Sequence, residues 1–393
     1  MELYEPLGTL APALYGSVEK WRHTLSGEYV AIKRMELRFA ARKRSVSSES
    51  AVEENVIAEI KTNLQIQSVG GHSNVLPMRD CIMENEAVLL VLKFCENGEL
   101  LHVLNMQRAA GKQINVLRYF GQILRGATFL HAHGIAHCDL SLENVLIDEY
   151  DCCQIADFGL AMQCSESTIV RPVGKLKYMA PEVSAALEYE GGHQKEYNPM
   201  MADVWALGVM LYAMVAAQYP FCEPTRRDTR FRLLEDFGVE YLLEKDEVDV
   251  TGKEQVVDLL KKLLVVNPLE RSKLAELESH ITVSRHESCE IRPASPTKAQ
   301  SSHVVVQEIM ASKSNTWQHA TSRCRLFRKG ETALMSANKL LFEAEKCHDA
   351  RATLTHTRSN TLANATPMTS NTGAKDLCTG GILIRKCFAT ALA

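Results

Sequence analysis

The chain has 393 residues, of which 46% are hydrophobic and 23% are charged, and its formal net charge is −4. This length allows one large domain or two ordinary ones, and the composition is typical of a soluble globular protein. The 12 cysteines show neither a regular framework spacing nor a recurring CxxC pair, which excludes a disulfide scaffold and gives no indication of a zinc site.

Neither the net charge nor any targeting signal points to nucleic acid or a membrane as a partner. The small net charge gives no reason to expect nucleic acid. The N-terminus does not resemble a signal peptide, and no apolar run looks long enough to span a bilayer. We therefore expect a cytoplasmic or nuclear protein without a membrane partner. The oligomeric state is left open.

The first part of the chain contains two predicted strands. Residues 29–35 form a short β-branched run that ends in a basic cluster, and residues 87–94 form a nearly continuous apolar run. Both patterns favour strands. Residues 50–67, which lie between them, have the composition of a helix.

The middle of the chain is predominantly helical. Residues 116–133 and 203–217 repeat apolar side chains at helical spacing. The order of the elements predicts an α+β architecture. A small, sheet-rich lobe would cover about residues 1–95, and a larger, mainly helical lobe would cover about residues 96–283.

The amino-acid composition changes after residue 283. From Ser284 onward there are 15 Lys and Arg against 8 Asp and Glu, and Ser, Thr, Ala and Asn are abundant. Residues 359–374 have no apolar period, whereas residues 331–354 have a weak helical pattern. We predict that residues 284–393 form a mildly basic tail that is largely disordered.

The strongest motif is HCDLSLEN at residues 137–144, directly before an apolar run. Asp139 can accept a hydroxyl proton, and Asn144, five residues later, can bind Mg²⁺. Asp157 opens a DFG triplet 13 residues after Asn144, and its carboxylate suits a Mg²⁺ that bridges ATP phosphates.

Two further motifs flank this pair. VAIK at residues 30–33 places Lys33 on a predicted strand, where its ammonium group can hold phosphate oxygens. The triplet APE follows at residues 180–182. Each motif alone is common, but the four in this order and at these spacings point to one family.

With these motifs, roughly the first 283 residues resemble the eukaryotic protein kinase family, of the Ser/Thr type. The resemblance implies a bilobal fold with a small antiparallel-sheet N-lobe that carries a helix called αC, and a larger helical C-lobe. It also implies an enzyme that uses ATP and Mg²⁺ to phosphorylate Ser or Thr hydroxyls of protein substrates.

The resemblance assigns roles to the motif residues. Asp139 would be the catalytic base, and Asn144 and Asp157 would bind the two Mg²⁺ ions. Lys33 would contact the ATP phosphates and pair with Glu59 on αC.

The resemblance also predicts the nucleotide contacts. Leu92 would be the gatekeeper, and the Cys95 backbone would bind adenine. The remaining predicted contacts are Leu10, Gly16, Val18, Ala31, Glu99 and Leu146.

Other assignments are structural. Arg271 is placed to pair with Glu182, and residues 203–208 resemble the buried helix that anchors the catalytic loop. Glu54 is the second candidate for the αC glutamate. If Glu59 is the correct one, Asn63 falls where the family usually has an apolar residue.

The phosphate-covering loop departs from the family pattern. Residues 11–18 should read GxGxxGxV, but Ala11 and Ala13 replace the first two glycines, and Pro12 lies between them. A Cβ restricts close approach of the backbone to phosphate, and proline has no N–H donor. We expect a stiffer loop and weaker ATP binding.

Cys138 replaces the arginine that usually receives an activation-loop phosphate. Without that cation a phosphate loses its main partner. We therefore predict that activity does not require phosphorylation of Ser165, Ser167 or Thr168. Arg171 is the alternative cation.

The residue types at two positions near the catalytic loop differ from the family pattern. Ser/Thr kinases usually carry Lys at the position of Ser141 and Thr at the position of Lys175, and these side chains meet near the transferred phosphate. Lys175 is therefore a candidate catalytic cation. The alternative is that its side chain points into solvent.

The substrate preference is less defined. The catalytic loop lacks the AAR insert of tyrosine kinases, which favours Ser/Thr specificity over a tyrosine kinase. Glu99 and Glu143 match positions that bind arginines upstream of the target, although both could instead serve the ribose or local structure. Ser45 and Ser47, which follow a basic run, are candidate autophosphorylation sites. A catalytically silent kinase-like scaffold is the competing function.

Overall fold

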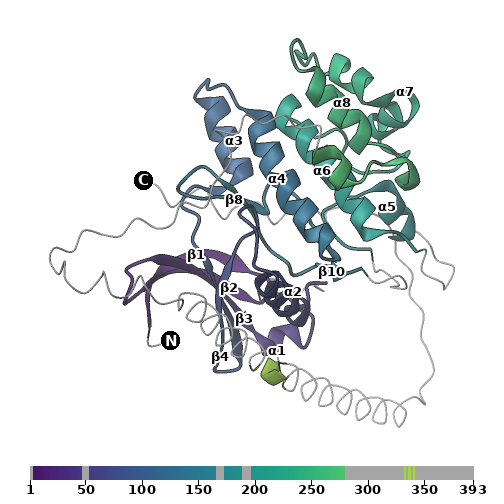
Figure 1. The fold of residues 1–393 in the computed structure, drawn as a ribbon. Coiled ribbons are helices and arrows are strands. Elements are labelled where there is room, and N and C mark those ends of the chain that lie inside the picture. The colour runs from purple at the N-terminus through teal and green to yellow at the C-terminus, as the bar shows by residue number, and fades with distance from the viewer. Residues whose placement is uncertain are drawn as a thin grey trace, which may run out of the picture. The chain divides into compact units, whose positions relative to one another are not determined.

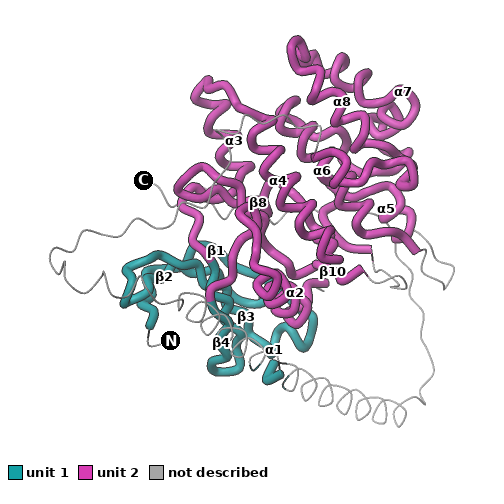
Figure 2. Tube along the Cα trace, in the orientation of Figure 1, with its two compact units in different colours: residues 1–52, 80–92, 329–393 teal, residues 53–79, 93–328 magenta. Residues whose placement is uncertain are grey.

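A computed structural model describes residues 3–46, 53–164, 172–187 and 196–278, together with positions 332, 335–337 and 340 (Figure 1). The chain divides into two compact units. Unit 1 comprises residues 1–52, 80–92 and 329–393, and unit 2 comprises residues 53–79 and 93–328 (Figure 2). Nearly all of the predicted tail lies outside the described residues, as do Ser47, Ser165, Ser167, Thr168 and Arg171.

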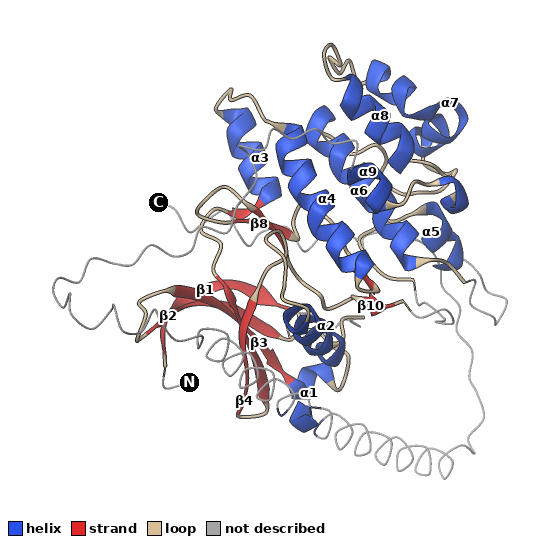
Figure 3. Ribbon diagram, in the orientation of Figure 1, coloured by secondary structure: helices blue, strands red, loops and turns tan. Residues whose placement is uncertain are grey.

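Unit 1 is built on a five-stranded sheet in the order β1-β2-β3-β5-β4 (Figure 3). β1 pairs with β2, and β2 with β3, in antiparallel fashion. A short helix, α1, follows β3. The elements are β1 (Tyr4–Ala13), β2 (Gly16–His23), β3 (Tyr29–Glu36), α1 (Leu37–Ala40), β4 (Met78–Glu84) and β5 (Ala87–Lys93).

The β-branched pattern of β3 explains its place in the sheet. Val30 and Ile32 are each 1% exposed and pack with Leu89 and Val91 of β5 in one apolar cluster. Because successive side chains of a strand point to opposite faces, Ala31 and Lys33 lie on the other face.

The loop after α1 differs from expectation. The cations Arg42 and Lys43 are exposed, as expected of a basic run, but Ser45 is only 1% exposed. The backbone N–H of Val46 donates to Leu14 O at 2.9 Å and draws this loop onto the β1–β2 hairpin. Ser45, a candidate autophosphorylation site, is therefore buried rather than exposed, and its phosphorylation stays a prediction.

Unit 2 is mainly helical. Within it, α4 packs against α6, α9 and β9, and α6 packs against α8. The helices are α2 (Val56–Ser68), α3 (Leu100–Ala109), α4 (Val116–Ala132), α5 (Pro181–Leu187), α6 (Pro199–Ala216), α7 (Thr229–Lys245), α8 (Glu254–Leu263) and α9 (Leu274–Glu278), with a 3₁₀ turn η1 (Pro268–Glu270). The short strands are β6 (Gly98–Glu99), β7 (Ile135–Ala136), β8 (Val145–Ile147), β9 (Cys153–Ile155) and β10 (Met162–Gln163).

Asparagine caps fix where three of these helices begin. Asn55 accepts from the backbone N–H groups of Ile57 and Ala58, Asn115 caps α4, and Asn198 caps α6. Such side chains satisfy amides that have no partner inside the helix. Pro199, at the first position of α6, needs no capping acceptor, because proline has no backbone N–H.

Helix α6 lies in the core of unit 2. By length and composition alone this helix could cross a membrane, and 72% of it is buried inside the protein. The expectation that no apolar run is long enough therefore overlooked α6. Its burial explains the composition, because a helix that is apolar on all sides is typical of a protein core. The predicted cytoplasmic or nuclear location stays a prediction.

The predicted α+β architecture, an antiparallel sheet followed by a mainly helical region, is confirmed. The helix predicted over residues 50–67 is α2. It groups by contacts with unit 2, because the Asn55 N–H donates to Gly159 O at 2.8 Å and Gln65 Nε2 donates to His133 O at 2.8 Å.

Candidate active site

The predicted catalytic loop is anchored on α6. Asp203, which is 2% exposed, accepts from the backbone N–H groups of His137 at 2.7 Å and Cys138 at 2.9 Å. His131 Nε2 lies 3.0 Å from the same carboxylate. Charge-assisted bonds of this kind are strong. The prediction that residues 203–208 belong to the anchoring helix is confirmed.

His137 links the loop to the DFG triplet. Its Nε2 lies 3.0 Å from Ala156 O, and the Asp139 N–H points to its Nδ1 at 3.3 Å. A carbonyl only accepts and an N–H only donates, so the proton lies on Nε2. The ring also packs against Phe158 at 5.3 Å between centroids. This arrangement fixes the backbone that carries Asp139.

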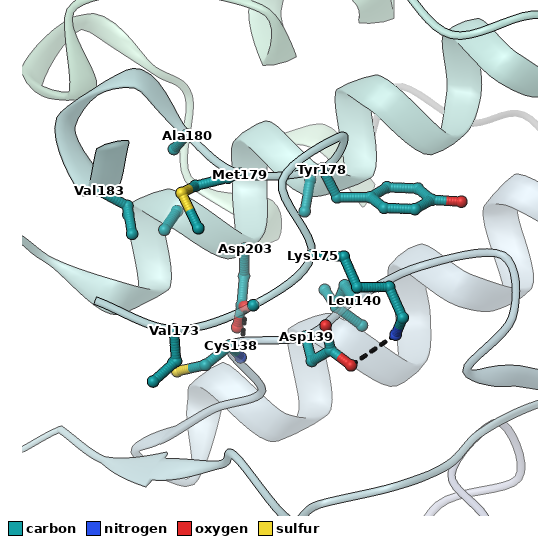
Figure 4. Close-up of a pocket in the computed structure, with 13 residues that line it drawn as sticks. Cys138, Asp139, Leu140, Val173, Lys175, Tyr178, Met179, Ala180, Val183 and Asp203 are labelled. Carbon is teal, nitrogen blue, oxygen red and sulfur yellow. Dashed lines mark hydrogen bonds and ion pairs between the residues drawn. The ribbon is translucent and has the colours of Figure 1, made fainter. Parts of the chain in front are cut away.

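Two side chains, those of Asn144 and Lys175, contact the Asp139 carboxylate. Asn144 Nδ2 donates to Asp139 Oδ2 at 2.7 Å and to Asp139 O at 2.8 Å. Lys175 Nζ lies 2.6 Å from the same Oδ2 (Figure 4), and it also lies 3.1 Å from Ser141 Oγ. The exchanged pair, Ser141 and Lys175, is thus in contact. Whether Lys175 is catalytic stays a prediction.

A pocket lies behind Asp139, between the catalytic loop, the segment around Lys175 and α6 (Figure 4). Its lining residues are Cys138, Asp139, Leu140, Val173, Gly174, Lys175, Tyr178, Met179, Ala180, Val183, Ala202, Asp203 and Ala206.

Cys138, one of these residues, has a backbone φ of 64°. Burial, and then the charge of Asp203, raise the pKa of its thiol well above the usual value. The position that usually holds arginine therefore carries a neutral side chain.

The two predicted Mg²⁺ ligands are brought close by a hairpin. β8 pairs with β9, and the Ala156 N–H donates to Asn144 O at 2.9 Å, so Asp157 follows directly on a residue bonded to Asn144. Asn144 Nδ2 donates to Asp139, and Oδ1 is the atom of this side chain that can bind a cation. A carboxylate and an amide oxygen are ligands that suit Mg²⁺. These residues therefore fit the ion.

The other predicted residues of unit 2 lie on the linker after β5, on β6, on β8 and on α2. Cys95 is 7% exposed, and Glu99 pairs with Leu146 across β6 and β8. Glu59 is 3% exposed. Asn63 Nδ2 donates to Glu59 O at 2.9 Å, so the polar side chain at the expected apolar position is bonded within its own helix.

The predicted residues of unit 1 follow the register of the sheet. Leu10 is on β1 and Leu92 on β5. Val18 of β2 lies opposite Lys33 of β3, which is 9% exposed. Ala31 lies on the same face as Lys33, two residues away.

The β1–β2 hairpin is held at its tip. Tyr15 is 2% exposed, and its carbonyl accepts from the Glu36 N–H at 2.9 Å. A Cβ added at Gly16 would lie 2.2 Å from Arg34 O, so packing against β3 alone requires this glycine. These contacts attach the tip of the hairpin to β3, and both the stiffer loop and the weaker ATP binding stay predictions.

Tyr178 is a site residue to which the sequence assigned no role. Its hydroxyl donates to Glu143 at 2.8 Å, accepts from the Leu142 N–H at 3.2 Å and lies 3.0 Å from the Tyr219 hydroxyl. It clamps the segment after Lys175 onto the catalytic loop. The signal was its position two residues before the APE triplet, but only the fold shows the partner.

The comparisons with known proteins agree with this geometry. The model of the protein kinase domain matches residues 4–282. The chain therefore belongs to the protein kinase family.

Three relatives are named as serine/threonine kinases. "Probable serine/threonine-protein kinase KCC4" of Saccharomyces cerevisiae is 29% identical over 281 residues, 71% of this chain and 26% of that protein. The serine/threonine-protein kinase GIN4 of the same yeast is 31% identical over 237 residues, 58% of this chain and 19% of that protein. The serine/threonine-protein kinase SAPK5 of Oryza sativa is 28% identical over 288 residues, 71% of this chain and 70% of that protein. The chain thus spans about a quarter of the length of KCC4 and about a fifth of the length of GIN4.

Proposed function

We propose that the chain is an active protein kinase that transfers the γ-phosphate of ATP to Ser or Thr hydroxyls of protein substrates. The observation that carries this proposal is the cluster at Asp139, where Asn144 and Lys175 both hold the same carboxylate oxygen. The named relatives support the choice of Ser/Thr over Tyr.

Asp139 orients the substrate hydroxyl and accepts its proton. Its Oδ2 is engaged by two neighbours, and its side chain is 14% exposed. A base held by hydrogen bonds has little freedom to leave the position from which it accepts the hydroxyl proton. Positioning of this kind supplies most of the catalysis in phosphoryl transfer.

Asn144 and Asp157 hold Mg²⁺, which when bound offsets the negative charge of the phosphates. Lys33 binds phosphate oxygens, and the family role of Glu59 is to orient that lysine. Both side chains are buried, and a buried charge requires a partner or hydrogen bonds.

Lys175 supplies the cation that Ser141 lacks. Its Nζ contacts both Asp139 and Ser141, which is where the family places the lysine of the catalytic loop. A cation there lowers the energy of the transition state, because negative charge spreads over the transferred phosphoryl group.

The substrate preference is for arginine upstream of the target. Burial raises the pKa of the Glu99 carboxyl, Glu143 raises it further, and Lys175 opposes them. A half-buried carboxylate beside a second one favours an incoming cation. Glu143 is partly engaged by Tyr178, so Glu99 is the main candidate for this contact.

A kinase-like scaffold without activity is the second candidate function. It is favoured by one observation, the anchored β1–β2 hairpin with Ala11 and Ala13 in place of the usual glycines and Pro12 between them. Such a scaffold would keep the fold and lose phosphate transfer.

Phosphoamino-acid analysis distinguishes these functions. The full chain is incubated with radiolabelled ATP, Mg²⁺ and a peptide mixture that contains Ser, Thr and Tyr acceptors. Label on Ser or Thr is expected. Label on Tyr alone would contradict the proposed specificity, and nucleotide binding without any label would favour the scaffold.

A further inference from the structure

The linker that follows β5 is tied to its surroundings at several points. It runs through residues 93–97 and carries Cys95, whose backbone is the predicted adenine contact. The Lys93 N–H donates to Pro77 O at 3.1 Å. The Asn97 N–H donates to Ile147 O at 3.1 Å, and Asn97 Nδ2 donates to Asp148 O at 2.7 Å.

The tightest of these ties is an ion pair. Lys93 Nζ lies 2.7 Å from Asp148 Oδ2, and the two side chains are only 20% and 4% exposed. Glu149 lies farther away, 3.8 Å from Lys93, and is 38% exposed. A charge as buried as Asp148 needs a partner, so this pair is far less screened than a surface salt bridge.

Asp148 is itself held rigidly. Its Oδ1 accepts from the backbone N–H groups of Tyr150 at 3.0 Å and Cys152 at 2.9 Å. Its Oδ2 also accepts from Gln154 Nε2 at 3.3 Å, and Gln154 reaches Ser73 O at 2.9 Å. Lys93 thus attaches the linker to a point fixed by the β8–β9 hairpin and by the loop before β4.

Both charges act on Cys95. Burial raises the pKa of its thiol to about 12, with Lys93 lowering it and Asp148 raising it. The ion pair therefore lies beside the residue that is predicted to present its backbone to adenine.

We infer that Lys93 and Asp148 are positioning residues for the nucleotide, a role that rests on the proposed function. In this role both side chains act through the backbone of the linker rather than by binding the nucleotide themselves. The pair fixes where the backbone of Cys95 lies, so that its hydrogen-bonding groups are already oriented before adenine binds. Pre-organisation of this kind lowers the entropy lost on binding.

Nucleotide affinity tests the inference without requiring turnover. ADP with Mg²⁺ is titrated into the full chain by calorimetry, for the wild type and for Lys93→Met and Asp148→Asn. Met keeps most of the apolar stem of Lys93, and Asn keeps the Oδ1 acceptor for Tyr150 and Cys152. We expect both variants to bind ADP about 10-fold more weakly.

Kinetics separate positioning from general damage. The KM for ATP should rise by the same factor, about 10-fold, while kcat at saturating ATP and the KM for peptide change less than about twofold. The double variant should bind ADP no more weakly than either single variant, because both changes remove one interaction.

Two matched controls complete the test. Lys93→Arg should keep most of the affinity, since it preserves the charge. Glu149→Gln should leave ADP binding unchanged, because that carboxylate is exposed and more distant. If Lys93→Met fails to fold, Asp148→Asn carries the same comparison.

Wild-type affinity for ADP in Lys93→Met and Asp148→Asn would overturn the inference. So would an equal rise in the KM for peptide, which would indicate a general structural role. A wild-type chain that binds no ADP would instead contradict the proposed function, and the inference with it.

Discussion

At the scale of single residues, the site is defined by what surrounds one carboxylate. Asp139 is held by Asn144 from its own loop and by Lys175 from the segment before the APE triplet. Lys175 Nζ also lies 3.1 Å from the Ser141 hydroxyl. Lys175 thus places a positive charge beside Asp139, although Ser141 stands where the family usually carries lysine.

Replacement of Lys175 tests this exchange. Lys175→Ala should lower kcat by about 100- to 1,000-fold, the usual cost of removing one group that stabilises transition-state charge. Lys177→Ala, two residues away, is the matched control and should have little effect. The reciprocal pair Ser141→Lys with Lys175→Thr should restore much of kcat. Unchanged turnover in Lys175→Ala would show that the lysine is a bystander.

The pH dependence of peptide binding tests Glu99. Its raised pKa means that the carboxyl becomes protonated at higher pH than an exposed glutamate, and only the ionised form attracts arginine. The KM for an arginine-containing peptide should therefore rise as pH falls toward that pKa. Glu99→Gln should flatten this rise, as should replacement of the arginine by alanine. If the KM rose equally with falling pH for the wild type, for Glu99→Gln and for the alanine peptide, Glu99 would be excluded as the arginine site.

At the scale of elements, α6 and its neighbours position the site. Asp203 on α6 holds the catalytic loop, and Arg271 joins α6 to α5. Arg271, whose side chain is 0% exposed, contacts Glu182 at 2.6 and 2.7 Å and donates to Met201 O at 2.8 Å. The predicted pairing of Arg271 with Glu182 is confirmed.

Removal of Arg271 should be costly. Arg271→Ala leaves the Glu182 carboxylate without its partner, and we expect a loss of about 3–5 kcal/mol in the free energy of unfolding. Urea denaturation measures it. Lys261→Ala is the control, because its ion pair with Glu240 is 53% and 60% exposed and should contribute less than about 1 kcal/mol. Equal losses in both variants would contradict this account.

The elements that the sequence predicted well are those with strong patterns. The β-branched run at residues 29–35 became β3, and the apolar run at residues 87–94 became β5. β1 was harder, because its glycine and proline residues and its exposed positions hide the alternation. α7 was missed because Gly238, with φ of 82°, breaks it into two pieces.

The site was predictable where motifs carry it and not where distant residues meet. Asp139, Asn144 and Asp157 are spaced by short loops, so their proximity follows from sequence. The pairing of Lys93 with Asp148 spans 55 positions, and the bond from Tyr178 to Glu143 depends on how two loops pack. No local pattern encodes such contacts.

At the scale of the whole molecule, regulation is the main question. In most of the family an arginine beside the catalytic base receives an activation-loop phosphate, and here that position is Cys138. Its thiol is neutral, because burial raises its pKa. The activation-loop hydroxyls lie outside the described residues, but the absence of this cation predicts that the chain is active without phosphorylation there.

A triple variant tests this prediction. Ser165→Ala, Ser167→Ala and Thr168→Ala together should leave kcat within about twofold of the wild type, since a phosphate without a paired cation contributes little order. A phosphatase-treated wild type serves as the control and should behave alike. Loss of activity in both would show that another cation, such as Arg171, receives a phosphate.

The measurement that tests the central claim most directly is phosphate transfer by the wild type compared with Asp139→Asn. Asparagine keeps the shape of the side chain but cannot accept the hydroxyl proton. We predict transfer to a Ser/Thr peptide by the wild type and a loss of about 100- to 10,000-fold in the variant, with ADP binding retained. Equal transfer by both proteins, or none by the wild type, would contradict the assignment of Asp139 as the catalytic base of an active kinase.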